Sequence, residues 1–328
     1  LAAWVSNSAA SAVEPSQDSE FLRLGERYID QFAAFSPVRA TGLGDHRFDG
    51  KLDDISEATR ARRMAWIRDL DRQLARVDKD KLSRANQVDY ALLKHELDAG
   101  LWRLTELREW EWNPLIYTGL TGDSIYGLMA RDFAPVRQRL VSVTERLEQF
   151  PRFLEQVRRT LKVARVPDVH AETAVSQNRG VLKTIDNMVR PLLKELPTED
   201  RERLVAAIDV AEKAIGQHQQ WLESELLPRA KGDFRIGIDL YERKLRYTLH
   251  SPMRRQEIRE LAAERVRQLH QQMYEIAKEL YRDQYPLTKF PDQPSDAFRR
   301  SVIRFGLEKA YAVSPAADQI VATAERSV

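Results

Sequence analysis

One apolar stripe of the sequence constrains the fold more than any other feature. Between residues 136 and 161, large apolar side chains recur at alternating intervals of four and three residues. Such spacing places all of them on one side of an α-helix, as in a coiled coil. We therefore expect a long helix packed along its length against others, with a kink at Pro151 because a proline ring is incompatible with an unbroken helix. The residues of the stripe are Val136, Leu140, Val143, Leu147, Phe150, Leu154, Val157 and Leu161.

The same periodicity recurs along most of the chain. Ser56, Ser83 and Ser295 each precede an apolar-periodic segment and can cap a helix N-terminus. Residues 41–50 are rich in turn-forming residues and predict a loop. No segment alternates apolar and polar residues for long enough to found a sheet, so we predict an all-α fold of long antiparallel helices. Further helices are expected over residues 18–35 and 169–195, from Thr198 to Pro228, after Ser251-Pro252 and after Ser314-Pro315.

Composition excludes several classes of function. The chain has no cysteine, which rules out disulfides, thiol catalysis and cysteine-based metal sites. Basic and acidic residues number 52 and 50, so the net charge is only +2 and nucleic acid is not an expected partner. No apolar run reaches the roughly 20 residues that a membrane-spanning helix needs, so no transmembrane segment is expected.

The two ends of the sequence suggest processing or truncation. A short apolar start followed by Ala10-Ser11-Ala12 is typical of a secretory cleavage site. Residues 1–17 are thus predicted to be a signal remnant or disordered leader, which indicates a periplasmic or otherwise exported protein; a cytoplasmic location is the alternative. Residues 18–328 are predicted to form one helical domain that is truncated, since the sequence stops at Val328 within an uncapped helical pattern.

Residues 109–134 interrupt the helical pattern with aromatic residues and glycines. Irregular segments carry binding residues more often than packed helices do, and aromatic side chains with a few polar groups suit the wall of a cleft. We predict a substrate-binding surface here, with a buried aromatic hub between helices as the alternative. The predicted binding residues are Asn113, Tyr117, Tyr126, Arg131 and Asp132.

No catalytic or metal-binding motif is complete in this chain. His95-Glu96 could begin a zinc helix of the form H-E-x-x-H, but Ala99 stands where the second histidine is needed. His170-Ala171-Glu172 has the H-x-E form of zinc deaminases, which also need cysteine ligands. We therefore predict no catalytic residue, no metal ligand and no cofactor within this chain.

Two other polar groups are interpreted as structural. His218 lies on the apolar stripe of its helix and is predicted to be a packed core residue. Asp45, Asp49, Asp53 and Asp54 lie close together in the sequence but lack the spacing of a calcium-binding loop, so a solvated turn is predicted.

The order of several short motifs resembles the domain of unknown function family 885, over residues 20 to 328. The matching segments are Ser36-Pro37, Thr41 to His46 with Asp53 to Ser56, Asn113-Pro114, Phe150 to Glu155, Trp221-Leu222 to Leu227-Pro228, and Gly232 to Gly237.

This resemblance implies the helical half of a cleft fold like that of carboxypeptidase Taq and related zinc peptidases. Family members carry their zinc helix in a C-terminal half, and this sequence ends before such a motif. The expectation is therefore the N-terminal, substrate-channel half of a zinc-dependent peptidase-like protein, with zinc in the complete protein. Its expected partners are a peptide substrate and its own C-terminal half. The alternative is a non-catalytic helical scaffold or binding protein of the cell envelope, because no site chemistry is visible in this chain.

Overall fold

The computed structural model describes residues 16–326, and regular structure there is helical. No β-strand occurs among these residues, although Pro167 and Gly232 form one isolated parallel bridge. This confirms the all-α prediction. Of the predicted leader, residues 1–15 lie outside the described part. Ser16 caps the first helix, its side chain accepting a hydrogen bond from the Ser19 backbone nitrogen (3.2 Å), and Gln17 begins that helix.

The chain divides into two compact units after Leu240, and each is described by itself. The first unit contains α1 (Gln17–Phe35), α2 (Pro37–Leu43), α3 (Glu57–Leu74), α4 (Arg84–Trp102), α5 (Leu115–Met129), α6 (Val136–Glu148), α7 (Phe150–Thr160), α8 (Asp168–Thr184) and α9 (Thr198–Trp221). The division falls within α10 (Ile238–Leu249).

Short helical turns connect or extend these helices. Turns of π-helix continue α4, α8 and α9 at Arg103–Leu107, Ile185–Val189 and Leu222–Leu226. Turns of 3-10 helix lie at His46–Phe48, Lys79–Lys81, Glu109–Glu111, Val163–Arg165, Arg190–Glu195 and Leu227–Arg229.

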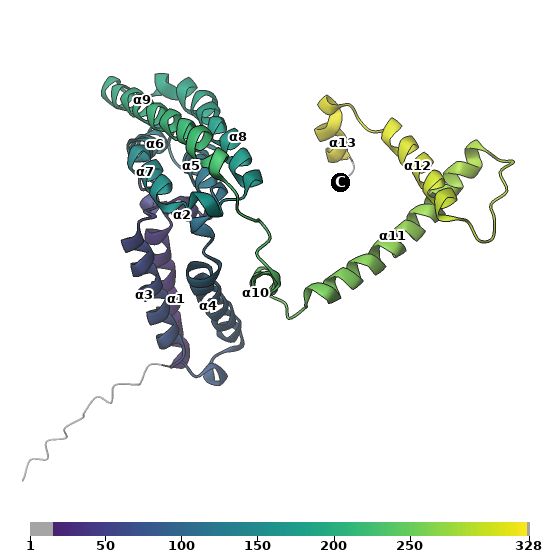
Figure 1. Ribbon diagram of the computed structural model, residues 1–328, viewed down its shortest axis with the longest axis horizontal. Helices are drawn as coiled ribbons and strands as arrows, with labels where there is room; N and C mark the ends of the chain where they lie inside the picture. The colour runs from purple at the N-terminus through teal and green to yellow at the C-terminus, as the bar shows by residue number, and fades with distance from the viewer. Residues whose placement is uncertain (1–15, 327–328) are drawn as a thin grey trace, which may run out of the picture. The chain divides into compact units, whose positions relative to one another are not determined.

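Two hydrophobic cores hold the first unit together. In Figure 1, α1, α3 and α4 stand side by side at one end of this unit and α5 to α9 at the other, with α2 between them. The smaller core fills the space between α1, α3 and α4, where Leu70 and Leu74 are completely buried. The larger core lies among α5 to α9 and contains the predicted stripe. Full burial of one leucine contributes about 2 kcal/mol, so these cores outweigh local helix propensity as the source of the fold.

The kink predicted at Pro151 is present as an interruption of the helix at Gln149, two residues earlier. The α6 helix ends at Glu148 and α7 begins at Phe150, which places Pro151 in the first turn of α7, where its missing N–H needs no partner. The stripe stays in register across the break, since Leu140, Leu147, Phe150 and Leu154 are all buried. The caps predicted at Ser56, Ser83 and Ser295 are also present, each side chain accepting a hydrogen bond from a backbone nitrogen three residues later.

Some predictions about secondary structure were wrong. Residues 109–134 are not mainly irregular, because α5 occupies Leu115–Met129 despite three glycines. Each glycine costs a helix about 1 kcal/mol, but one face of α5 is buried, including Tyr117, Ile125 and Leu128, and this packing decides the conformation. The expected loop over residues 41–50 begins only after α2 ends at Leu43. In the second unit, the helix expected after Ser251-Pro252 starts at Arg255.

The second unit contains α11 (Arg255–Gln284), α12 (Asp296–Ala312), a 3-10 turn at Ala317–Gln319 and α13 (Ile320–Arg326). Its small core joins α11 to α12 through Tyr274, Ala277 and Val302. At Gly306 a β-carbon would lie 2.7 Å from Cβ of Ala277, so the glycine allows the two helices to approach closely. None of the helices formed by residues 16–326 combines the length and apolar composition of a membrane span.

Candidate functional site

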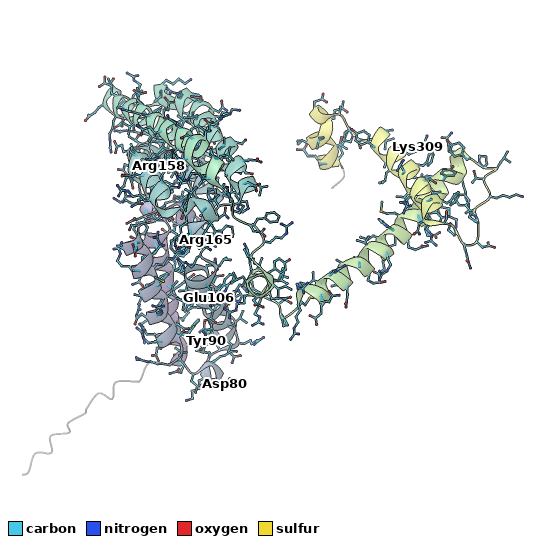
Figure 2. All side chains as sticks on the ribbon, in the orientation of Figure 1. Asp80, Tyr90, Glu106, Arg158, Arg165 and Lys309 are labelled. Atoms are coloured by element: carbon cyan, nitrogen blue, oxygen red, sulfur yellow. The ribbon has the colours of Figure 1, made fainter. Side chains whose placement is uncertain are left out.

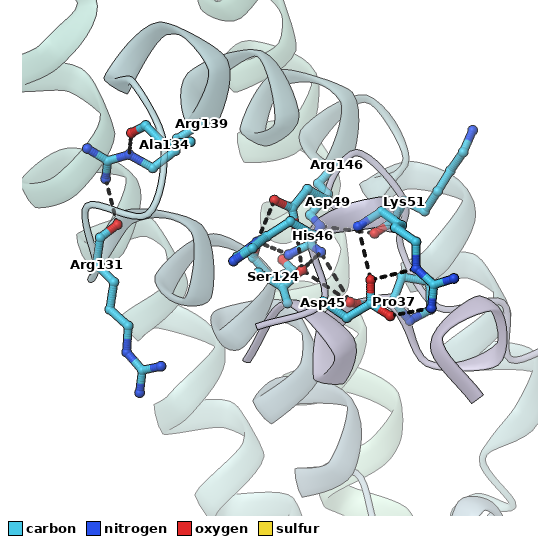
Figure 3. A network of polar contacts seen from close by, with 12 residues as sticks. Pro37, Asp45, His46, Asp49, Lys51, Ser124, Arg131, Ala134, Arg139 and Arg146 are labelled. Carbon is cyan, nitrogen blue, oxygen red and sulfur yellow. Dashed lines mark hydrogen bonds and ion pairs between the residues drawn. The ribbon is translucent and has the colours of Figure 1, made fainter. Parts of the chain in front are cut away.

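Arg146 lies at the centre of a buried polar network in the first unit. It is on α6, with 0% of its surface exposed. Its Nε donates to the carbonyl oxygen of Lys51 (2.9 Å), Nη1 to that of Ser124 (2.7 Å) and Nη2 to Oγ1 of Thr41 (2.6 Å). Burial of a charge is tolerated when hydrogen bonds replace those of water. The network therefore ties α6 to α5 and to the segment around α2 (Figure 3).

Two of the four aspartates predicted to form a solvated turn are buried instead. Asp49 and Asp53 are each 8% exposed. Asp49 accepts a hydrogen bond from Oγ1 of Thr41 (2.7 Å), and Asp53 accepts one from the backbone nitrogen of Val38 in the first turn of α2 (3.1 Å). The prediction failed because Arg146, almost a hundred residues further along the chain, supplies the positive charge that makes burial of these carboxylates acceptable.

Burial perturbs the ionisation of this network. Burial raises the pKa of Asp53 to about 6, against the opposing hydrogen bond from Val38 and the charges of Arg63 and Arg146. It lowers the pKa of Arg146 to about 10, although the charges of Asp49 and Asp53 favour the protonated form. Arg146 thus remains cationic at neutral pH, whereas Asp53 changes its charge in mildly acidic solution.

His46 lies at the edge of this network and is held on two sides. Its Nδ1 is 2.9 Å from Oδ2 of Asp49, and its ring stacks on Phe133 with centroids 3.7 Å apart and planes 11° from parallel. Gly44 makes this placement possible, because it ends α2 with a φ of 91°, a conformation that glycine adopts without strain. The contact with Asp49 engages Nδ1 and sets the orientation of the ring. The other ring nitrogen, Nε2, is therefore the atom with which this histidine would bind a ligand or transfer a proton.

A pocket of about 510 Å³ opens beside His46, between α2 and α5. Two of the five predicted binding residues line it, Tyr126 and Arg131, and Tyr126 is 57% exposed. The backbone carbonyl of Arg131 accepts a hydrogen bond from Arg139 (3.1 Å), while its side chain extends away from that contact (Figure 3). The other lining residues are Val38, Arg39, Thr41, Gly42, Leu43, Gly44, Leu120, Asp123, Gly127, Ala130 and Phe133.

The structure places the other three predicted residues elsewhere. Tyr117 is a buried core residue whose hydroxyl donates to the carbonyl of Trp110 (2.6 Å), and burial raises its pKa. Asn113 accepts a hydrogen bond from the Leu115 backbone nitrogen (3.1 Å) at the start of α5. Asp132 pairs with Arg139 (2.6 Å) and does not line the pocket. The environment of Tyr117 is therefore that of the alternative prediction, a buried aromatic hub between helices.

Sequence reasoning did not single out His46, Thr41 or Arg146 as site residues. The segment from Thr41 to His46 did carry a signal, since it was one of the motifs that resembled a known family. Arg146 carried none: it stands beside Leu147 of the apolar stripe, where an arginine is ordinarily taken for the solvent edge of a helix.

His218 is confirmed as a packed core residue. It is 2% exposed and stacks on Trp221 with ring centroids 5.5 Å apart. Burial lowers its pKa to about 3, and the charge of Arg158 acts in the same direction, so the ring is neutral. Its Nδ1 has no hydrogen-bond partner among residues 16–326.

Neither unit by itself, within its described residues, gathers three histidine or carboxylate ligand atoms close enough to share a metal ion.

Comparison with known proteins identifies a family and three similar solved chains. A family model described as bacterial protein of unknown function (DUF885) matches residues 37–326. A solved structure from Shewanella oneidensis, described as a candidate lipoprotein of unknown function, matches with 26% sequence identity and a TM-score of 0.75. That match covers 93% of this chain and 55% of the other, so this chain spans about half the length of its solved relative. No curated protein matches.

Proposed function

The chain belongs to the DUF885 family of bacterial proteins of unknown function, and we propose that it forms the ligand-binding helical part of a longer protein of the cell envelope. The pocket beside His46 carries this proposal. The Arg146 network joins α5 to the α2 segment and holds Thr41 on the pocket wall, so the two walls are positioned before a ligand binds, and such preorganisation favours affinity. An envelope location is supported by the solved relative, which is described as a candidate lipoprotein.

The ligand that we propose is a peptide. Arg39 and Arg131 on the pocket wall suit a carboxylate, Asp123 suits an ammonium or amide N–H, and Tyr126 and Phe133 suit an apolar side chain. A pocket with both signs of charge and an aromatic surface matches the chemistry of a short peptide better than that of a purely apolar or purely anionic ligand.

The finer form of the proposal is that the longer protein is a zinc-dependent peptidase. Nearly half of the solved relative lies outside the match, which leaves room for a second part. Zinc in a peptidase polarises the scissile carbonyl and activates water. Among residues 16–326, neither unit by itself gathers three ligands for such an ion, so in this proposal these residues bind and orient the peptide. The second candidate function is a non-catalytic binding protein of the envelope, which the pocket beside His46 and the lipoprotein relative support equally well.

The test uses the full-length natural protein. We expect bound zinc, chelator-sensitive hydrolysis of short unblocked peptides, and a KM about tenfold higher in Tyr126→Ala and in Arg131→Gln, because loss of a central aromatic or arginine contact typically costs more than 1 kcal/mol. Tyr311→Ala and Arg137→Gln change exposed residues of the same types outside the pocket and serve as controls.

Three outcomes are informative. Zinc and hydrolysis with a raised KM support the peptidase form. Absence of zinc and of hydrolysis, with peptide binding that is weakened by Tyr126→Ala, supports the non-catalytic binding protein. Peptide binding that is equal in Tyr126→Ala, Arg131→Gln and the unmodified protein would show that the pocket beside His46 is not the binding site.

A further inference from the structure

A second pocket of the first unit is built around one buried carboxylate. The Glu111 side chain is 1% exposed, and three cations contact it: Arg108, Lys162 (2.7 Å) and Arg165. Burial opposes ionisation of Glu111, but the hydrogen bonds from Lys162 and Arg108 outweigh it and hold its pKa below the ordinary value. Figure 2 labels Arg165 partway along the first unit, between the end that holds α5 to α9 and the end that holds α1, α3 and α4.

The three basic groups carry more positive charge than the single Glu111 carboxylate can neutralise. One Glu111 charge is shared by three basic groups whose side chains remain 40% to 54% exposed. The remaining positive charge therefore faces solvent on the open side of the cluster. Because these basic groups are still partly solvated, their excess charge carries no full desolvation cost and is available to an anionic ligand.

The exposed side of this cluster opens into a pocket of about 730 Å³ between α3, α7 and the turn at Glu109–Glu111. The charged residues on its wall are Arg60, Arg108, Arg159, Lys162, Glu57 and Glu111, so two positive charges are in excess. Two further charged residues contact this wall from outside the pocket: Glu155 pairs with Arg159, and Arg165 pairs with Glu111. Their charges are opposite, so the excess of two positive charges is unchanged.

Trp110 gives the pocket an aromatic wall that orients its arginines. The guanidinium carbon of Arg60 lies 4.1 Å from the centre of the Trp110 ring, and that of Arg108 lies 5.5 Å from it. A stacked guanidinium keeps its in-plane N–H donors directed outward, which suits bidentate binding of an oxyanion. Ala61, Met64 and Leu104 supply an apolar surface in the same pocket.

The backbone at Arg108 supports a specific role for this side chain. Arg108 has a φ of 50° and a ψ of 41°, the left-handed conformation that usually selects glycine or asparagine after a helix. A residue with a side chain adopts it at a cost of about 1 kcal/mol. The contacts of the Arg108 guanidinium with Glu111 and Trp110 offset this cost.

We propose that this pocket binds a small dianionic ligand, with a phosphate or paired carboxylate group on Arg60, Arg108 and Lys162 and an apolar or aromatic body against Trp110, Met64 and Leu104. The N-terminus of α3, where Ser56 and Glu57 line the pocket, adds the positive end of a helix dipole. This inference concerns a different pocket from the one beside His46 and does not depend on the proposed function.

Calorimetric titration of the full-length protein with three probes tests the proposal. Phenyl phosphate and isophthalate each combine a ring with two negative charges, while benzyl alcohol carries the ring alone. We expect one site per chain for at least one of the two anions, an affinity that falls as salt is added, and no measurable binding of benzyl alcohol. A preference for phenyl phosphate would identify a phosphorylated ligand, and a preference for isophthalate a dicarboxylate.

Two variants and a matched control locate the site. Arg60→Gln and Lys162→Gln each remove one charge-assisted hydrogen bond and should weaken binding about tenfold or more. Arg72→Gln removes the same charge from the same helix, α3, at an exposed position outside the pocket, and should leave affinity unchanged. If neither anion binds, or if Arg72→Gln weakens binding as much as Arg60→Gln does, the proposal is wrong.

Discussion

Replacing Arg146 by methionine tests whether the buried network holds the first unit together. Methionine is apolar and matches the arginine side chain as far as Nε, so the change removes all the donors together with the guanidinium carbon and its two terminal nitrogens. It leaves the carbonyl oxygens of Lys51 and Ser124 and the hydroxyl of Thr41 without their present donor. Each charge-assisted hydrogen bond contributes about 1.5–3 kcal/mol, and part of that gain is offset by the cost of burying the guanidinium. We expect a net loss of about 4 kcal/mol.

Tryptophan fluorescence in urea measures this loss for the first unit. All tryptophans in the sequence precede Leu240, so the signal follows that unit. With a slope of about 2 kcal/mol per molar urea, the unfolding midpoint should fall by about 2 M. Arg137→Met, on the same helix, removes an exposed arginine that pairs with Asp200 and should cost less than about 1 kcal/mol. Equal effects of the two substitutions would refute the reasoning.

Two further predictions concern a carboxylate and a glycine. The pKa of Asp53, raised to about 6 in the folded state from 3.8, means that the folded protein keeps a proton that the unfolded chain releases between about pH 4 and 6. Stability should therefore fall by about 3 kcal/mol as pH rises through this window, and urea midpoints of Asp53→Asn across the same range should lack this fall. At Gly232 a β-carbon would lie 2.0 Å from the carbonyl oxygen of Arg165, so Gly232→Ala should cost about 2 kcal/mol in thermal unfolding. Gly216→Ala, in open space on α9, should instead gain about 0.5–1 kcal/mol.

The candidate site shows where sequence reasoning reaches its limit. Tyr126 and Arg131 were predicted as binding residues from their aromatic, glycine-containing surroundings, and both line the pocket beside His46. Tyr117 was predicted with them on the same grounds but faces the core. The difference is set by the helical phase of α5, which turns Tyr117 inward and Tyr126 outward, and that phase could not be read from a segment predicted to be irregular.

The sequence by itself determined the all-α class, most helix boundaries and the break at Pro151, because apolar periodicity, capping serines and prolines act over a few neighbouring residues. Only the tertiary structure decided which charges are buried. Arg146 is far from Thr41 and Asp49 in the sequence, and Glu111 is far from Lys162 and Arg165. Burial of each charge depends on partners from distant parts of the chain, so no local pattern of residues could reveal it.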